Sequence, residues 1–198
     1  ACCEILINSY RNSFFNVNDY KIKHEVLLAS ARAGNVIGGG DWSTDRLMPD
    51  IALAASLDKK VQIRNPLSVR PWQHVLDCLY GYILLGAKLL NGAKEFGEAW
   101  NFSPYSNEAK TVNDIAAVAK QSWDKVEVEF GTPPENFHEA GLLILNNAKA
   151  IAELGWKPVW DTTKAVEKTM EWYKTYYNEN KLITDDHIAE YLKNVSNA

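Results

Sequence analysis

The apolar run at residues 26–31, Val-Leu-Leu-Ala-Ser-Ala, constrains the fold of this chain most strongly. Successive side chains of a strand point to opposite faces, so a run without polar alternation predicts a strand that is buried on both faces. Such strands belong to parallel sheets that helices cover on both sides. The run leads into Gly38-Gly39-Gly40, so the sequence predicts an α/β protein with a glycine-rich loop after a parallel strand.

Helical and extended patterns alternate through the first half of the chain. Apolar residues recur at helical spacing from residue 1 to about 15, from 46 to 57 and from 75 to 90. Short strands are predicted between these helices at Val61–Ile63 and Ala99–Phe102. This order is typical of βα units.

Smaller elements follow residue 104. The capping-box spacing of Thr111 and Asp114 predicts a helix that reaches about Trp123. A last long helix should begin after Asp161, with one face in the core. The apolar residues of that face are Val166, Met170, Tyr173 and Tyr177. The other predicted elements are strands at 126–130 and 142–145 and a helix at 147–154 that closes at Gly155.

The composition excludes several classes of partner. With 198 residues and 46% hydrophobic residues, the chain can bury one substantial core or two small ones. Its formal net charge of -4 and its lack of Lys or Arg runs argue against nucleic-acid binding. No apolar run approaches the length of a membrane span, so we expect no membrane insertion.

The three cysteines indicate the compartment. Cys2, Cys3 and Cys78 fit buried reduced thiols better than a disulfide framework, which predicts a cytoplasmic protein. No Cys or His spacing matches a pair of metal ligands, so no metal site is expected.

The loop Gly38-Gly39-Gly40 does not have the dinucleotide-binding fingerprint. Ser43 stands where that fingerprint has Gly or Ala, and no acidic residue ends a strand about twenty residues later. Two interpretations remain open. The loop could be a flexible active-site loop whose backbone donors face a ligand, or a simple turn between a strand and a helix.

Three arginines beside Gly or Pro loops, Arg46, Arg64 and Arg70, suggest an anion site in a net-acidic chain. Guanidinium groups bind phosphate oxygens in a bidentate way that Lys cannot, so a diphosphate is a suitable ligand. The alternative is that each is a surface arginine with a solvated head.

Three further polar positions are ambiguous. Asn101 lies within an apolar strand, where a buried amide needs a partner, and a backbone hydrogen bond that ends the strand would supply one. His74 is interpreted as a buried structural histidine at a strand end. His138 and Glu139 are too few to form a metal site.

Two segments carry a resemblance to a known family. Residues 32–42, Arg-Ala-Gly-Asn-Val-Ile-Gly-Gly-Gly-Asp-Trp, and residues 63–75, Ile-Arg-Asn-Pro-Leu-Ser-Val-Arg-Pro-Trp-Gln-His-Val, closely resemble the substrate-binding loops of CDP-glucose 4,6-dehydratases. These enzymes are extended short-chain dehydrogenase/reductases. Residues 1–15 resemble the part of the family's catalytic helix that follows its Tyr-x-x-x-Lys motif. The resemblance reaches about residue 178 and implies the C-terminal part of such an enzyme.

The resemblance implies a Rossmann-type α/β fold with a smaller α/β lobe that binds a sugar nucleotide. Residues 1–34 and 75–104 would belong to the NAD-binding lobe. Residues 35–74 and 105–178 would form the sugar-nucleotide lobe, and 179–198 a C-terminal tail.

The reaction of the family converts CDP-glucose to CDP-4-keto-6-deoxyglucose. Hydride passes from C4 of the glucose to NAD, water is lost across C5 and C6, and hydride returns to C6. The acid, base, Tyr, Lys and glycine fingerprint of this scheme would all precede Ala1. We therefore expect no catalytic residue in this chain and no activity from the chain alone.

The resemblance also assigns binding roles. Arg70 would grip the diphosphate, residues 62–64 would lie against the base, and the segment 137–140 would meet the ribose. The substrate-binding residues would be Asn35, Arg46, Leu47, Gln62, Ile63, Arg64, Arg70, Asn101, His138 and Glu139. The cofactor-binding residues would be Ala33, Gly34 and Asn35.

Two other functions and one assembly question stay open at this point. The chain could belong to another NAD-dependent sugar-nucleotide dehydratase or epimerase, or it could be a non-catalytic sugar-nucleotide-binding module. The family's four-helix interface implies a homodimer through residues 1–15, which carry a second apolar stripe at Cys2 and Ile5. The alternative is that the missing half of the same subunit covers that stripe.

Overall fold

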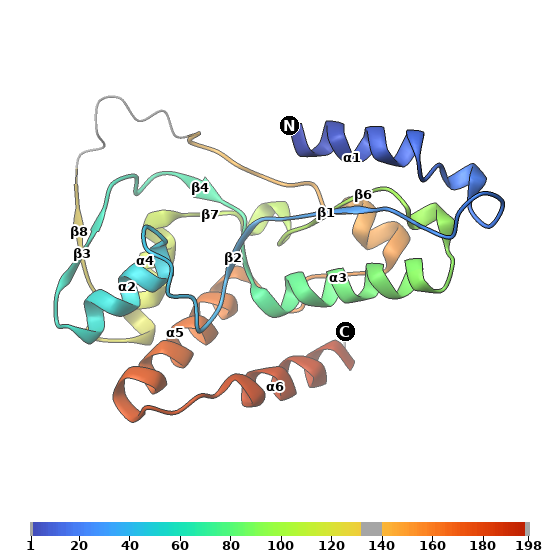
Figure 1. The fold of residues 1–198 in the computed structure, drawn as a ribbon. Helices are drawn as coiled ribbons and strands as arrows, with labels where there is room; N and C mark the ends of the chain where they lie inside the picture. Colours follow the sequence, from blue (N-terminus) through green and yellow to red (C-terminus); the bar gives the residue numbers. More distant parts are fainter. Residues whose placement is uncertain (1, 132–139, 197–198) are drawn as a thin grey trace.

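The structure, a computed structural model, describes residues 2–131 and 140–196. Six α-helices alternate with short strands in this part of the chain (Figure 1). The helices are α1 (Cys2–Ser13), α2 (Leu47–Ser56), α3 (Val75–Leu90), α4 (Val112–Ser122), α5 (Thr162–Glu179) and α6 (Thr184–Ser196). The strands are β1 (Ser30–Ala33), β2 (Asn35–Ile37), β3 (Lys60–Ile63), β4 (Val69–Arg70), β5 (Trp72–His74), β6 (Ala99–Phe102), β7 (Lys110–Thr111) and β8 (Glu127–Phe130). A π-helix spans Ala150–Leu154, and 3-10 turns span Val17–Asp19, Lys94–Phe96 and Ser106–Glu108.

The strands of the described residues form four pairs, and parallel pairing dominates them. β1 pairs with β6, β2 with β5 and β3 with β8, all in parallel, whereas β4 and β7 are antiparallel. Parallel partners need a long crossover, and helices supply it here, as between β2 and β5. The predicted α/β class with parallel pairing is confirmed.

Two apolar clusters hold the described part of the chain together. In the first, α2, α4 and α5 pack around fully buried residues such as Ile51, Ile115 and Met170. In the second, α3, β6 and the π-helix pack around Trp100 and Trp156. The π-helix residues thus join the cluster of α3, and the division into lobes expected from the sequence stays a prediction.

Local signals set several helix ends. Thr111 and Asp114 form the predicted capping box of α4, with the Thr111 hydroxyl accepting from the Asp114 N–H at 3.1 Å. Asp161 accepts from the Lys164 N–H at 2.7 Å and begins α5. Gly155 has a φ of 72°, the left-handed conformation predicted for a residue that ends a helix.

Two strand predictions are wrong. The strand expected at 26–31 begins at Ser30, because β6 offers only four residues as partners and residues 26–29 pair with no strand among those described. It is also not buried on both faces as expected, since Val26 is exposed, as are Ala31 and Arg32 of β1. The strand expected at 142–145 is a single bridge between Leu142 and Val69. Leu142, Leu143 and Ile144 are exposed, so their apolar run reflects neither a core strand nor a core helix.

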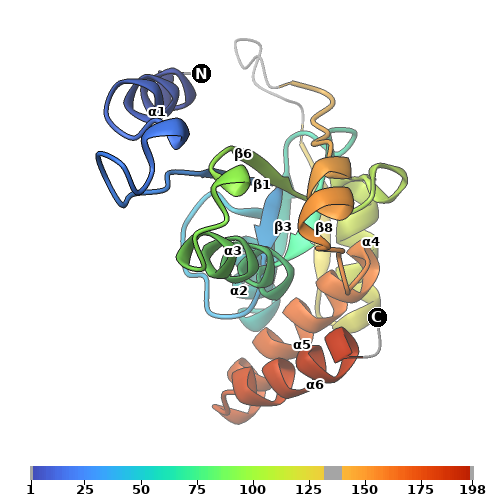
Figure 2. The same ribbon diagram turned by 90° about the vertical axis from the view of Figure 1, so that its right-hand side faces the viewer.

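The C-terminal tail expected at 179–198 contains a helix. α6 lies beside α5, as both views show (Figures 1 and 2), and Lys164 and Lys168 of α5 form ion pairs with Glu190 of α6. His187 and Tyr191 are buried one turn apart on α6, and Asp185 lies in its first turn. Spacing and charge of this kind favour a helix, although no helix is predicted there from the sequence above.

The N-terminal helix stands apart from both clusters in Figures 1 and 2, and none of its residues is buried. The expectation of buried thiols is therefore wrong for Cys2 and Cys3, which are exposed, and right for Cys78. All three thiols are free. Within residues 2–131 and 140–196, none of the helices has the length and hydropathy needed to cross a membrane.

Candidate functional site

A cavity of about 580 Å³ lies where β2, the start of α2, β3 and β4 meet. Loops and strand ends supply its wall, as is common for ligand sites in α/β proteins. Most of the binding residues expected from the sequence line it. They are Gly34, Asn35, Arg46, Leu47, Gln62, Ile63, Arg64 and Arg70.

Close backbone packing at Gly34 brings two of these segments together. A Cβ atom at Gly34 would lie 2.3 Å from the Pro71 carbonyl oxygen, so only glycine fits there without a backbone shift. The Asn35 N–H donates to that carbonyl at 2.9 Å, and Asn35 pairs with Trp72 in the β2–β5 ladder. The segments 32–42 and 63–75, far apart in sequence, are thereby joined at the cavity.

The three arginines line one cavity but differ in environment. Arg70 is 7% exposed and donates Nη1–H to the Val69 carbonyl at 2.9 Å. Arg46 and Arg64 are exposed, and their guanidinium nitrogens lie 3.5 Å from carboxylate oxygens of Asp41 and Asp45. The interpretation as a solvated surface arginine is therefore wrong for Arg70, while Arg46 and Arg64 have accessible heads.

Three carboxylates share the cavity with the arginines. Burial, together with the charge of Asp45, raises the pKa of Asp50. Burial would also raise the pKa of Asp41, but hydrogen bonds from Ser43 and the charge of Arg46 outweigh it and lower that pKa. The described part of the wall thus carries both positive and negative groups, and an entering anion would compete with Asp41 for Arg46 and with Asp45 for Arg64.

The edge formed by β3 presents Gln62, Ile63 and Arg64 in sequence. Ile63 is buried, and the Gln62 amide donates to the Glu129 carboxylate on β8 at 2.6 Å. Glu129 therefore fixes the orientation of Gln62, a role that the sequence reading missed. The sequence predicts a strand at 126–130 but not its partner. The parallel pairing of β8 with β3 places Glu129 beside Gln62.

The glycine-rich loop is tightly packed on its outer side. Gly38 lines the cavity, and a Cβ atom there would lie 2.7 Å from the Val75 side chain. A Cβ atom at Gly39 would lie 2.1 Å from the Trp172 ring, and Gly40 has a φ of 83°. These contacts explain the glycines as a close-packed turn, and the position of Gly38 also makes the turn a wall of the cavity.

Four of the expected site residues lie elsewhere or outside the described residues. Ala33 ends β1 opposite Phe102 and does not line the cavity. The Asn101 amide donates to the Asn146 carbonyl at 3.0 Å. This is the backbone hydrogen bond that a purely structural role of Asn101 requires. The Asn101 Oδ1 atom is buried without a hydrogen-bond partner among the described residues. His138 and Glu139 fall outside the described residues.

His74 has the structural role predicted for it. It is buried at the end of β5, and its Nδ1 atom accepts from the Leu76 N–H at 3.2 Å as the N-cap of α3. Burial, with the positive charges of His187 and Lys168, lowers the pKa of His74 to about 3, so it is neutral at physiological pH. In the described part of the chain, no three His, Cys, Asp or Glu side chains come together as metal ligands.

Comparison with known proteins gives a sequence relative and several structural ones. No family model matches the chain. The chain is 43% identical over 195 residues to the CDP-glucose 4,6-dehydratase of Salmonella typhimurium, and the match covers 97% of this chain and 54% of that protein. The chain therefore spans about half the length of the curated relative that it matches.

Solved structures of similar fold include an epimerase and enzymes named for sugar-nucleotide substrates. An epimerase from Methanothermobacter thermautotrophicus superposes with a TM-score of 0.72 at 20% identity, covering 88% of this chain and 48% of that one. The dTDP-glucose 4,6-dehydratase of Bacillus anthracis, solved with NAD, gives a TM-score of 0.65 at 22% identity, with coverage of 83% and 49%. The UDP-glucuronic acid 4-epimerase of Bacillus cereus gives a TM-score of 0.69 at 18% identity, and the match covers 88% of this chain and 50% of that one.

The sequence match and the fold lead to the same group of proteins. The chain has the Rossmann-type α/β fold of the extended short-chain dehydrogenase/reductases, and its resemblance to the CDP-glucose 4,6-dehydratases is confirmed over nearly its whole length.

Proposed function

We propose that the protein containing this chain is an NAD-dependent CDP-glucose 4,6-dehydratase, and that this chain supplies mainly its sugar-nucleotide site. The observation that carries the proposal is one cavity lined by Arg46, Arg64 and Arg70. A diphosphate brings negative charges that guanidinium groups neutralise and bind through paired N–H donors. The identity to the Salmonella dehydratase supports a cytidine nucleotide as the ligand.

Arg70 is the first candidate to hold the diphosphate. Its side chain is buried yet lines the cavity, so its charge acts where little water screens it. Arg46 and Arg64 lie at the rim, and exposed pairs at 3.5 Å such as theirs contribute little stability. Both can therefore leave Asp41 and Asp45 for a phosphate or a base at small cost.

The remaining polar residues of the wall suit the other parts of the ligand. We place the base against Gln62 and Ile63 of β3 and against Arg64, which directly follows β3. The sugar with its first phosphate would lie beside Asn35 and Leu47. The contact of Asn101 with a phosphate stays a prediction. The same holds for the contacts of His138 and Glu139 with the ribose.

Gly34 and Asn35 fit one end of NAD. Both line the cavity, and Ala33 directly precedes them. Their backbone N–H groups donate to the Phe102 and Pro71 carbonyls, so the group that can hydrogen bond a carboxamide is the Asn35 side-chain amide. The chemistry that bound NAD would supply is a reversible hydride transfer with the sugar. The part of this chain is to hold the diphosphate and orient the sugar. The family's catalytic Tyr and Lys would lie outside it, so we expect no turnover by the chain alone.

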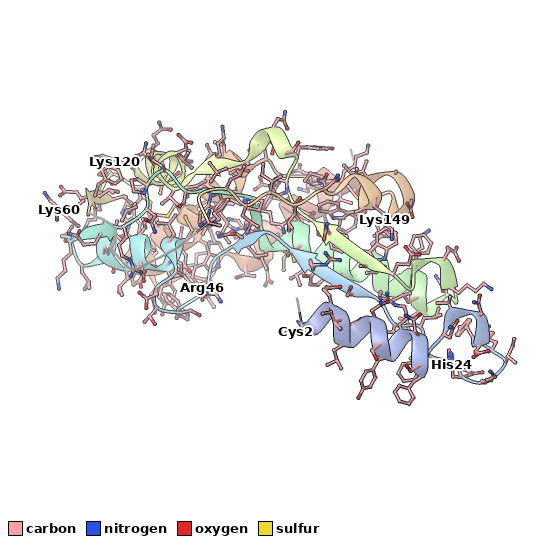
Figure 3. All side chains as sticks on the ribbon, turned by 90° about the horizontal axis from the view of Figure 1, so that it is seen from above. Cys2, His24, Arg46, Lys60, Lys120 and Lys149 are labelled. Carbon is pink, nitrogen blue, oxygen red and sulfur yellow. The ribbon has the colours of Figure 1, made fainter. Side chains whose placement is uncertain are left out.

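The exposed face of α1 supports a homodimer of the intact enzyme. Its side chains extend away from the rest of the molecule in Figure 3, and Ile5 and Leu6 are 70% and 58% exposed. Apolar surface of this kind is covered in most proteins by another protein surface. The alternative cover is another part of the longer protein. We place the enzyme in the cytoplasm, where sugar nucleotides and reduced thiols occur together.

The test is the affinity of the purified protein for CDP-glucose, measured by titration calorimetry. Replacing Arg70 with Ala removes a charge-assisted contact of about 1.5–3 kcal/mol, which weakens binding roughly ten- to a hundredfold. Arg70→Lys keeps the charge without the planar fork and should give an intermediate loss. Arg11→Ala, on α1 and outside the cavity lining, is the matched control and should bind like the wild type.

Folding of each variant is checked by circular dichroism, because Arg70 is buried. An unchanged dissociation constant in folded Arg70→Ala would refute the assignment of Arg70. A base other than cytosine is the alternative, since the solved structures of similar fold include enzymes described with UDP and dTDP sugars.

A further inference from the structure

We propose that the aromatic face of α5 positions the glycine-rich wall of the cavity from behind, with α6 bracing it. This aromatic face consists of Trp172, Tyr173, Tyr176 and Tyr177. None of these residues lines the cavity, whereas Gly38, Asp41 and Arg46 of the opposite segment do. The contacts of α5 with the loop do not depend on the proposed function, whereas their consequence for ligand affinity rests on it.

The first contact is between Gly39 and Trp172. The Trp172 side chain is 6% exposed, and a Cβ atom at Gly39 would lie 2.1 Å from its Cγ and Cδ2 atoms. The loop backbone therefore lies directly on the indole ring. The ring is itself held from the other side, because its Nε1–H donates to the Thr184 hydroxyl at 2.9 Å. Thr184 is the first residue of α6, which links the C-terminal helix to the loop.

The second contact is a hydrogen bond from Tyr173 to the loop backbone. The Tyr173 hydroxyl donates to the Asp41 carbonyl at 2.6 Å, and the residue is fully buried. Burial raises the pKa of Tyr173, so the hydroxyl remains a donor at every physiological pH. The side chain of Asp41 lies 3.5 Å from Arg46 across the same loop. A shift of the Asp41 backbone would therefore move the partner of a proposed ligand-binding arginine.

The third contact is aromatic. The Trp42 ring lies 5.1 Å from the ring of Tyr176 and 5.6 Å from that of Tyr173, both within the range of favourable ring pairs. Residues 39, 41 and 42 are thus each held on α5, while residues on either side of them line the cavity. Three contacts of different kinds fix one short loop, which distinguishes a positioning surface from incidental packing.

The test is the variant Tyr173→Phe, which removes one hydrogen bond and keeps the ring. The readouts are amide hydrogen exchange and CDP-glucose affinity in the purified protein. We expect amides of residues 38–46 to exchange about 3- to 10-fold faster and affinity to fall by a similar factor, as the loss of one hydrogen bond allows. Exchange in α2 and α4 should not change.

Tyr176→Phe is the matched control, because this Tyr belongs to the same face and its hydroxyl makes no hydrogen bond with the described residues. A second variant, Thr184→Val, loosens the brace behind Trp172 and should speed loop exchange about twofold or more. Its control is Thr169→Val, since the Thr169 hydroxyl is buried on α5 but donates within the helix to Ala165 at 2.8 Å.

Three results would overturn the proposal. One is loop exchange in Tyr173→Phe equal to that in Tyr176→Phe. Another is faster exchange in α2 and α4 as well, which would mark Tyr173 as a merely structural residue. The third is faster loop exchange without any change in the affinity of a wild-type protein that binds CDP-glucose. If the wild type does not bind, the proposed function fails, and the exchange result still decides whether α5 positions the loop.

Discussion

The buried, neutral His74 should make the stability of this protein fall with acid, and the size of the effect follows from its environment. Its ring lies 4.7 Å from the Trp160 ring and 6.5 Å from the His187 ring, and the side chain is 3% exposed. Burial and the charges of His187 and Lys168 lower the pKa of His74 from 6.5 to about 3. Below pH 6.5 His74 is protonated in the unfolded chain but stays neutral in the folded chain. The stability contribution of the neutral His74 is therefore fully present above pH 6.5 and is lost as the pH falls toward 3.

Between pH 8 and pH 5 this linkage removes about 2 kcal/mol from the free energy of unfolding. Asp77 acts in the opposite sense, because burial raises its pKa to about 6 and its protonation on folding adds about 1 kcal/mol at pH 5. A comparison with His74→Asn isolates the histidine, since Asn keeps an oxygen that can cap α3. The difference in pH dependence between the two proteins then reports the titration of His74.

The assay is urea unfolding followed by tryptophan fluorescence at pH 8 and pH 5. From pH 8 to pH 5, the wild type should lose about 2 kcal/mol more stability than His74→Asn. If His74→Asn loses as much stability in acid as the wild type, His74 is not the buried neutral group described here.

Two further predictions concern the loop and the chain as a whole. Gly39→Ala should lower the free energy of unfolding by about 1–3 kcal/mol, measured by urea unfolding, because its Cβ atom has no space beside Trp172; a stability equal to the wild type would contradict the close packing. The 198-residue chain, verified by mass, should form no 4-keto product from CDP-glucose and NAD. Turnover by that chain would show that catalytic groups lie within it.

The elements with local signals were predictable from the sequence. The capping residues Thr111 and Asp161 and the helical spacing of residues 75–90 act within a few positions, and the helices form where these signals place them. The prediction for 26–31 is wrong, because apolar residues alone show neither where a hydrogen-bonding partner begins nor whether neighbouring elements cover both faces of the strand. α6 was missed because its buried face has few apolar residues and is fixed by polar contacts, such as the Tyr191 hydroxyl to Asp77 at 2.8 Å.

The site was predictable to the extent that the resemblance covered it. The two loop segments gave the residues that line the cavity, among them Asn35, Arg64 and Arg70. Periodicity could not show that Arg70 is buried while Arg46 is exposed, because burial depends on segments distant in sequence, such as β7, which pairs with the strand of Arg70. The contact of Tyr173 with Asp41 spans 132 positions of the chain, and a helical pattern alone marks Tyr173 as core.

A calorimetric titration of the purified protein with CDP-, dTDP-, UDP- and GDP-glucose under one set of conditions tests whether the cavity is a cytidine sugar-nucleotide site. We expect binding of CDP-glucose, with the other three at least about tenfold weaker, because a site that hydrogen-bonds one base leaves its polar groups unpaired with another. Equal affinity for all four would support the diphosphate site and refute the cytidine assignment. No binding of any of the four by the folded protein would contradict the proposal that this cavity is a sugar-nucleotide site.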